Sequence, residues 1–227
     1  RRLAPAGPAG QTPNREATVG EVRRISHVVP AADLPLEARY QVIEQARMLA
    51  EAACRFDPNL VDHECALRPL NGADVGLTGH GWNETVSRTP GTGDNGYEDS
   101  LINIPGTNAA RAYRFLVIYG IHLASSWDSV LGVRFVVGGA RTHQWDFQAA
   151  LIGYPSDPQR ADRTLYVYPP PMPGWIDPPQ IPSRTSFLLQ QYIRGASANQ
   201  AQPAELVLLG WVAEPVSSGG GGLYAGG

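Results

Sequence analysis

Six stretches in the second half of the chain concentrate or alternate apolar residues in the way that β-strands do. They are rich in β-branched and aromatic residues and are separated by turn signals such as Gly138-Gly139. No amphipathic helix of crossover length lies between them, which disfavours a parallel α/β fold. The pattern therefore predicts a mainly β fold, an antiparallel sandwich or barrel. The six ranges are 111–125, 129–139, 143–154, 164–170, 186–195 and 204–215.

Alternating apolar side chains in these ranges are expected to form the core. We expect this set to be Phe115, Val117, Tyr119, Val133, Phe135, Leu188, Leu206, Leu208 and Trp211. Aromatic residues within strands most often fill a core, although flat rings could instead line a carbohydrate-binding platform. The aromatic residues open to both interpretations are Trp127, Trp145, Trp175, Trp211, Tyr119, Tyr166, Tyr168 and Tyr192.

One amphipathic helix is predicted at about 35–54. Asp33 lies at or beside its N-cap, and Pro35 falls in the first turn, where a missing N–H costs nothing. The helix should end before Asp57-Pro58. Its buried stripe is expected to contain the apolar residues that recur at helical spacing: Leu36, Tyr40, Ile43, Ala46, Ala50 and Ala53.

The rest of the chain divides around these elements. Residues 1–30 are expected to form an extended N-terminal arm, because their first twenty positions are rich in Pro, Gly and Ala and hold no aromatic residue. Residues 31–110 are predicted to be the helix and a long-loop region packed on the sandwich, with short strands possible at 83–87 and 101–104. The sandwich core is assigned to 111–216, and 217–227 is expected to be a flexible Gly-rich tail.

A proline-rich segment, PPPMPGWIDPPQIP at 169–182, is predicted to be a rigid strap, because its seven prolines enforce an extended path that cannot join a sheet interior. Trp175 is presented on this strap and is predicted to be an interface anchor. The alternative is that it plugs an open end of its own sandwich. The predicted interface residues are Trp175, Pro173, Ile176 and, in the tail, Tyr224.

The low charge of the chain restricts the kinds of molecule that it is expected to bind. Charged residues make up only 17% of the chain, and the net charge is −3. Without a global basic field, the folded body is not expected to bind nucleic acid specifically. No run approaches the roughly 20 apolar residues needed to cross a bilayer, so we expect a soluble protein without a membrane span. A surface poor in charge suits contact with other proteins.

Candidate chemistry is sparse. The histidines form no metal-binding motif, and no serine elbow, phosphate loop or dinucleotide fingerprint is present. Asp62-His63-Glu64-Cys65 could supply metal ligands but is better explained as a solvated loop, and 93–99 (GDNGYED) as a turn with solvated acids. Cys54 and Cys65 could form a disulfide or remain two small thiols. We therefore predict no catalytic residue, no cofactor and no metal, and not an enzyme.

The runs YRFLVIYGIHL, SVLGVRFVVGG and SFLLQQYIRGASANQAQPAELVLLGWVAEP resemble the jelly-roll structural proteins of viruses and bacteriophages. Small single-jelly-roll capsid subunits and their decoration or vertex relatives are the most similar class. The resemblance implies a two-sheet sandwich in the virion that associates with copies of itself and with other virion structural proteins. The alternatives are a carbohydrate- or receptor-binding sandwich of a spike or tail fibre, and a small β-sandwich hydrolase.

Overall fold

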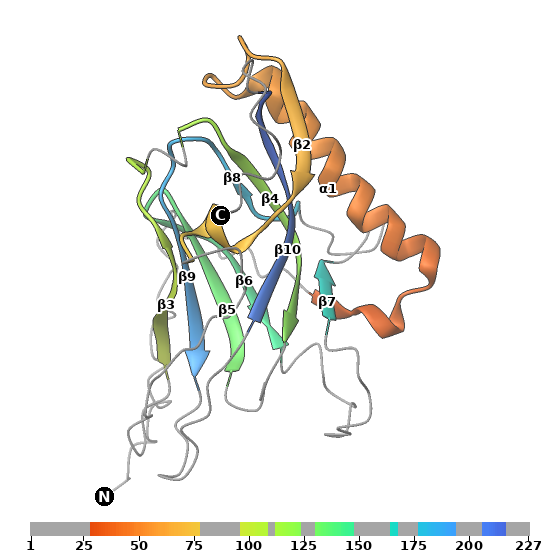
Figure 1. Cartoon of the computed structure of the whole chain (residues 1–227). Helices are drawn as coiled ribbons and strands as arrows, with labels where there is room; N and C mark the ends of the chain where they lie inside the picture. Colours follow the sequence, from red (N-terminus) through yellow and green to blue (C-terminus); the bar gives the residue numbers. More distant parts are fainter. Residues whose placement is uncertain are drawn as a thin grey trace, which may run out of the picture.

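Two antiparallel sheets face each other, and one long helix lies on the outside of the larger sheet (Figure 1). The computed structural model describes residues 28–77, 96–108, 112–123, 130–147, 164–167, 177–193 and 206–216. The larger sheet contains β1 (Val28–Pro30), β2 (Cys65–Pro69), β4 (Phe115–Leu123), β7 (Thr164–Val167), β8 (Gln180–Ile181) and β10 (Leu206–Pro215). The smaller sheet contains β3 (Gly96–Ile104), β5 (Val130–Val137), β6 (Ala140–Asp146) and β9 (Phe187–Ile193). The expected mainly β fold with one N-terminal helix is confirmed.

The strand orders interleave distant parts of the chain. The larger sheet has the order β1-β7-β4-β10-β2. Strand β8 pairs with the same edge of β4 as β7 does, but at residues 116–117 rather than 120–122. The smaller sheet has the order β3-β9-β5-β6. Between β2 and β10, every connection passes from one sheet to the other except the β5–β6 hairpin and the β7–β8 step. The two sheets are thus joined repeatedly by the chain itself.

All six strand ranges predicted from the apolar pattern overlap a strand, namely β4, β5, β6, β7, β9 and β10. Strand β6 begins at Ala140, three residues before its predicted range, and ends at Asp146. The region 66–110 differs from the long loop that the sequence predicted. It supplies β2, which pairs with β10, and β3, which pairs with β9 and includes the suspected strand at 101–104. The sandwich therefore begins well before residue 111. Gly, Asn and Asp in 93–99 hid the start of β3, because these residues usually mark turns.

The β5–β6 hairpin follows directly from its sequence. Gly138 and Gly139 lie between the strands with φ angles of +61° and +81°. A two-residue turn with both φ angles positive matches the right-handed twist of the strands that it joins, and glycine adopts it without steric cost. The predicted turn is confirmed.

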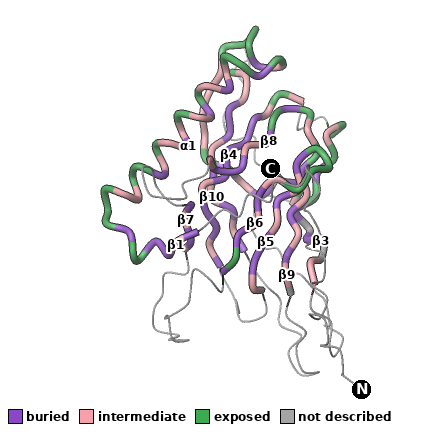
Figure 2. Tube along the Cα trace, turned by 180° about the vertical axis from the view of Figure 1, so that it is seen from behind, coloured by how far each residue is buried: buried purple, intermediate pink, exposed green. Residues whose placement is uncertain are grey.

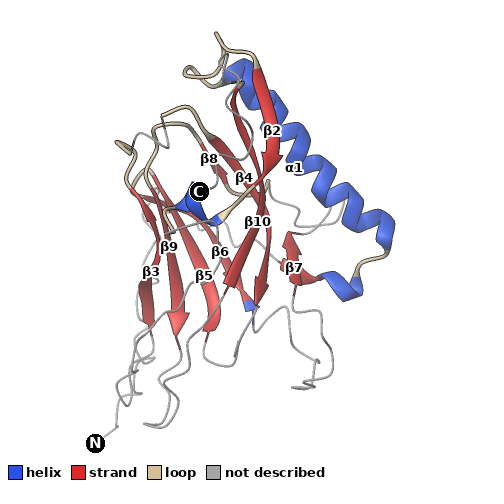
Figure 3. Cartoon of the chain, in the orientation of Figure 1, coloured by secondary structure: helices blue, strands red, loops and turns tan. Residues whose placement is uncertain are grey.

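Helix α1 (Leu36–Phe56) packs through small side chains, with Ala46, Ala50 and Ala53 against β4 and β10 (Figure 3). Its amino-terminal half differs from the prediction. Val42 is buried there, whereas Leu36 and Tyr40 are 63% and 62% exposed. Val42 lies on the same face of the helix as the three alanines. Leu36, Tyr40 and Ile43, which were expected to be buried, lie on a neighbouring face. Alanines let the helix approach the sheet closely, and that contact sets which face is buried.

The start of α1 also differs in detail. Pro35 is the N-cap rather than a first-turn residue, and no side chain caps the helix. Asp33 instead ends a short 3₁₀ turn, η1 (Ala31–Asp33), that connects β1 with the helix. The predicted end before Asp57 is confirmed, since Asp57 is the C-cap.

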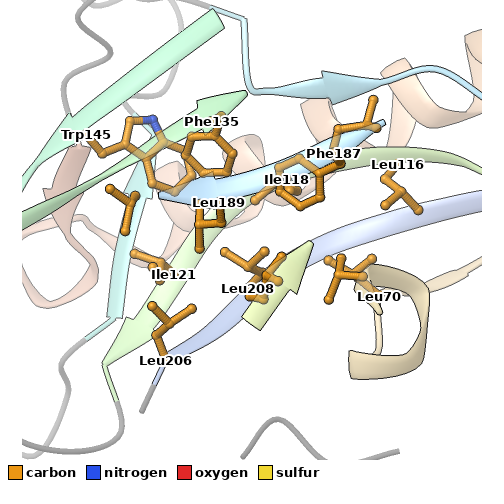
Figure 4. Packing of buried hydrophobic residues seen from close by; sticks show 14 of the residues in the cluster. Leu70, Leu116, Ile118, Ile121, Phe135, Trp145, Phe187, Leu189, Leu206 and Leu208 are labelled. Carbon is orange, nitrogen blue, oxygen red and sulfur yellow. The ribbon is translucent and has the colours of Figure 1, made fainter. Parts of the chain in front are cut away.

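The main core lies between the sheets and contains Phe135, Trp145, Phe187 and Leu208 among its fully buried side chains (Figure 4). Figure 2 shows the buried residues concentrated on the strands, while the outer side of α1 is largely exposed. A second cluster lies between α1 and the larger sheet. Strand β4 is therefore buried on both faces, with Phe115 and Val117 toward the helix and Leu116 and Ile118 toward the smaller sheet.

Six of the nine predicted core residues are buried: Phe115, Val117, Val133, Phe135, Leu206 and Leu208. Tyr119, Leu188 and Trp211 are only half-buried. Leu188 was assigned to the wrong face, because in β9 the inward positions are Phe187, Leu189 and Gln191. In a run that is apolar at consecutive positions, alternation alone does not fix the face. Trp211 packs against α1 and donates its indole N–H to the Ile43 carbonyl oxygen at 3.2 Å.

The described end of the proline-rich segment, 177–182, lies along β4. Pro179 accepts a hydrogen bond from the Ile118 N–H at 2.9 Å, and Ile181 is fully buried. Among the strands that the structure describes, β8 pairs with β4. Of the predicted arm at 1–30, residues 28–30 form β1 and pair with β7. The rest of the arm, the suspected strand at 83–87 and the tail 217–227 lie outside the described residues.

Candidate functional site

The outer face of the smaller sheet carries a row of side chains that crosses all four strands. Tyr97 on β3 is paired in register with Tyr192 on β9, which is opposite Gly132 on β5, which is opposite Asp146 on β6. Asp146 lies between the buried Trp145 and Phe147, Tyr192 follows the buried Gln191, and Gly132 precedes the buried Val133. Because side chains alternate along a strand, these positions, and Tyr97 paired with Tyr192, are on the face that points away from the core. Two aromatic rings therefore lie on one side of a glycine and a carboxylate lies on the other.

This row encloses a shallow hollow. The hollow has a volume of about 270 Å³ and is lined by Tyr97, Leu131, Gly132, Gln144, Asp146 and Tyr192. A side chain at position 132 would fill it, and the structure excludes one. A Cβ atom placed on Gly132 would lie 2.5 Å from the Trp145 carbonyl oxygen. The close approach of β5 and β6 thus keeps the hollow open.

The tyrosines beside the hollow are held in place by their neighbours. Their ring centroids are 5.1 Å apart in an edge-to-face arrangement, a favourable geometry for aromatic pairs. The guanidinium carbon of Arg134 lies 3.6 Å from the centroid of the Tyr97 ring, a cation–π contact. Arg134 also donates a hydrogen bond to the Gln144 side chain at 3.4 Å. Burial raises the pKa of Tyr97, and the adjacent Arg134 opposes that rise.

A second row of polar residues lies next to the first. Gln190 on β9 donates its side-chain amide to Asp99 on β3 at 2.9 Å, and in register it is opposite Arg134 on β5. The hollow is therefore flanked by groups of both charges and by amides. Such a surface is able to bind a ligand through stacking and hydrogen bonds.

The strongest charge network lies elsewhere, around Asp74 in the 3₁₀ turn η2 (Gly72–Val75). Asp74 is only 1% exposed and receives two 2.7 Å hydrogen bonds from Arg68 and a 3.1 Å ion pair from Arg114. Both arginines also bind Glu214, at 2.6 and 2.9 Å. Burial alone would raise the pKa of Glu214, but Arg68 and Arg114 outweigh burial and lower it. These mutually satisfied charges connect β2, η2 and β10 with the residue that precedes β4 and so stabilise this part of the fold.

The interface residues predicted from the sequence, Trp175, Pro173, Ile176 and Tyr224, all lie outside the described residues, as does Trp127. The structure therefore does not test them. Asp62, His63 and Glu64 are exposed in the loop after α1, and His63 makes an edge contact with the ring of Tyr113 at 5.5 Å. Among the described residues, no three His, Cys, Asp or Glu side chains come together in a way that could hold a metal ion.

The two cysteines are free thiols packed against the same apolar cluster beneath α1. Cys54 contacts the Ala50 carbonyl oxygen at 3.8 Å, and Cys65 contacts that of Leu60 at 3.8 Å. Burial, followed by the hydrogen bond and charge of Cys65, raises the pKa of Cys54 to about 12. A thiol with such a pKa is a poor nucleophile at neutral pH.

Sequence reasoning missed most of the hollow. Of its lining residues, only Tyr192 was considered as a ligand-binding aromatic, and 93–99 was interpreted as a turn although Gly96 to Asp99 belong to β3. A usable signal existed in LGVRF (131–135), where a single glycine interrupts an apolar strand. Such a glycine often marks a close backbone approach.

The comparisons with known proteins find no counterpart: no family model, curated protein or solved structure matches this chain. In the part of the chain that the structure describes, no helix combines the length and the apolar character required to traverse a bilayer. The functional argument therefore rests on the fold and on its surfaces.

Proposed function

We propose that this chain is a structural subunit of a viral or bacteriophage virion, a capsid or decoration protein that associates with copies of itself and with other virion proteins. The order of the strands carries the proposal. If the edge strand β1 is set aside and β7 and β8 are taken as one interrupted strand, the remaining strands have the orders β2-β10-β4-β7/β8 and β3-β9-β5-β6. This order resembles that of a jelly roll, in which eight strands form two Greek keys in two sheets, a fold common among viral capsid domains.

Jelly rolls also occur in lectins and in metal-dependent enzymes, so the fold alone does not select this function. Helix α1, which lies outside the sandwich, favours the interpretation that this chain is a subunit that binds other proteins. Helix α1 leaves large apolar side chains in solvent at Leu36, Tyr40 and Phe56, the last 80% exposed. Exposed aromatic and aliphatic groups of this size are typical of protein contact surfaces.

The proposed contact is between α1 of one subunit and a second subunit in the assembly. Burying a side chain the size of Tyr or Phe contributes about 1.5–3 kcal/mol. Leu36 and Tyr40, one turn apart at the start of α1, would form one such contact, and Phe56, at the other end of the helix, would form a second. The strap residues Trp175, Pro173 and Ile176 and the tail residue Tyr224 stay predicted as further contacts of the same kind.

The test is assembly of the purified chain, followed by analytical ultracentrifugation and negative-stain microscopy across protein concentration and salt. We expect closed shells, rings or lattices to form as concentration rises. Tyr40→Ser and Phe56→Ser should each raise the critical concentration for assembly by about tenfold or more. Both should leave the melting temperature of the subunit nearly unchanged.

Glu37→Gln is the matched control, because this side chain is exposed on the same helix and is not apolar. It should assemble like the unmodified chain. A chain that stays monomeric in every condition, alone and with the other proteins of its virion, would overturn the proposal. Assembly that is insensitive to both α1 variants would remove the helix from the contact.

A further inference from the structure

We propose that the hollow over Gly132 binds a neutral sugar unit of a glycan. The site lies on the open face of the smaller sheet, opposite the side of the molecule that carries α1. The inference does not depend on a role in the virion, since the same surface could bind a sugar on any jelly roll. It rests on the shape of the hollow, on its aromatic wall and on the polar groups opposite that wall.

The size of the hollow suits one sugar ring. Tyr192 and Asp146 flank Gly132 on the neighbouring strands, so their backbones are about 9.6 Å apart across the missing side chain. The resulting volume of about 270 Å³ lies just below the range of pockets that hold drug-sized ligands. A monosaccharide unit fits such a space, whereas a folded protein segment or an extended peptide would need a longer groove.

The wall formed by Tyr97 and Tyr192 matches the apolar side of a sugar. One side of a pyranose ring presents mainly C–H groups, which are attracted to the negative face of an aromatic ring. Both tyrosines are half-buried, so their rings are partly supported and partly available. The cation–π contact with Arg134 and the tyrosine pair hold the rings before binding, which lowers the entropy lost when a ligand arrives.

The opposite wall supplies hydrogen-bonding groups. The exposed Asp146 carboxylate is able to accept hydrogen bonds from two sugar hydroxyls, and the Gln144 amide both donates and accepts. Hydrogen bonds that involve an ionised group contribute more than neutral ones, so Asp146 should dominate the polar contribution. Sugar hydroxyls both donate and accept, and they are the ligand groups that this mixed wall fits.

The charge of the site indicates a neutral sugar. Asp146 lines the hollow and would repel the carboxylate of an acidic sugar. The positive charge of Arg134, stacked on Tyr97, offsets the negative charge of Asp146, so the hollow carries no net charge that would favour an acidic sugar. Neutral hexoses and N-acetylhexosamines are therefore the expected ligand class.

The experiment begins with the full chain on a panel of neutral and acidic glycans. Titrations with methyl glycosides of glucose, galactose, mannose, N-acetylglucosamine and N-acetylgalactosamine follow, monitored by ligand-observed NMR. We expect at least one neutral glycoside to bind and acidic glycans to bind more weakly. Tyr192→Ala and Asp146→Asn should each weaken binding by about tenfold or more. Asp146 is exposed, so the melting temperature of Asp146→Asn should change little, whereas Tyr192→Ala removes a half-buried ring and should lower it modestly. Circular dichroism at the assay temperature should show that both variants are folded.

Tyr113→Ala is the control variant, because Tyr113 is a 44% exposed tyrosine outside the hollow. It should bind like the unmodified chain. Failure of every neutral glycoside to bind, or binding that survives both hollow variants, would overturn the proposal. If Tyr192→Ala instead abolishes subunit assembly and no glycan binds, the face is a contact between subunits and the sugar site is rejected. Glycan binding by a chain that never assembles would support this inference while overturning the virion role.

Discussion

Asp57, the C-cap of α1, accepts hydrogen bonds from both the backbone N–H and the side-chain hydroxyl of Ser183, at 3.0 and 2.5 Å. The two residues are 126 positions apart and both are buried. Asn59 completes the arrangement by donating its backbone N–H to the same carboxylate and its amide to the Ser183 hydroxyl. The end of the helix is thereby attached to the segment that leads into β9.

Replacing Asp57 by alanine should destabilise the fold by about 2–3 kcal/mol, because it leaves the buried donors of Ser183 without their acceptor. Urea unfolding followed by tryptophan fluorescence measures the change. Asp62→Ala is the matched control, since Asp62 is an exposed carboxylate in the same loop and its loss should stay within about 0.5 kcal/mol. Equal effects of the two variants would contradict the role assigned to the Asp57–Ser183 contact.

Protonation of two carboxylates, Asp57 and Glu214, should lower the stability of the fold at acid pH. Burial alone would raise the pKa of Asp57, but hydrogen bonds from Ser183 and Asn59 outweigh it and lower that pKa. The pKa of Glu214 is lowered in the same way by Arg68 and Arg114. A group whose pKa is lower in the folded state takes up protons more readily when unfolded. Its contribution is complete above about pH 4–5, the unfolded range, and is lost as pH falls through the folded pKa.

The measurement is the free energy of unfolding from about pH 7 down to about pH 3 for the unmodified chain and for Asp57→Asn and Glu214→Gln. Each variant should start from lower stability at neutral pH and should lose less on acidification. A pH dependence as steep as that of the unmodified chain would show that neither carboxylate contributes.

The β5–β6 turn provides a test of backbone conformation alone. Gly139→Ala should cost about 1–2 kcal/mol, because its φ of +81° is unfavourable for a residue with a Cβ, although no atom lies within 4 Å of the added carbon. Gly96→Ala is the control: its surroundings are equally open, and its φ is not in the left-handed region. The two variants should differ by about 1 kcal/mol or more in chemical unfolding. A similar change in both would disprove the assigned turn geometry.

Cys54 should react slowly with thiol reagents. Its pKa of about 12 leaves roughly one molecule in ten thousand as thiolate at about pH 8, and the thiolate is the reactive form. Alkylation of Cys54 by iodoacetamide in the unmodified chain, distinguished from that of Cys65 by mass spectrometry of peptides, should be far slower than for free cysteine under native conditions and should become comparable after unfolding. Rapid native alkylation would contradict the burial of this thiol.

The sequence by itself determined the class of the fold and many of its parts. The six strand ranges, the helix, its end at Asp57 and the Gly138-Gly139 turn were predictable, because each depends on local periodicity or on the backbone preferences of a few residues. The sequence did not reveal β2, which is short and ends in a proline, or the beginning of β3, which is polar and starts with a glycine. Both segments form strands by pairing with β10 and β9. Those partners are more than ninety positions away in the chain.

The tertiary structure alone decided which side chains meet. The Asp57–Ser183 contact, the exposure of Leu36 and Tyr40, and the outward position of Leu188 all depend on how the helix and sheets pack. The hollow over Gly132 takes one lining segment from each of β3, β5, β6 and β9. Local propensity acts over a few residues, whereas a surface site on a sheet is fixed by register between distant strands, and no local pattern encodes that register.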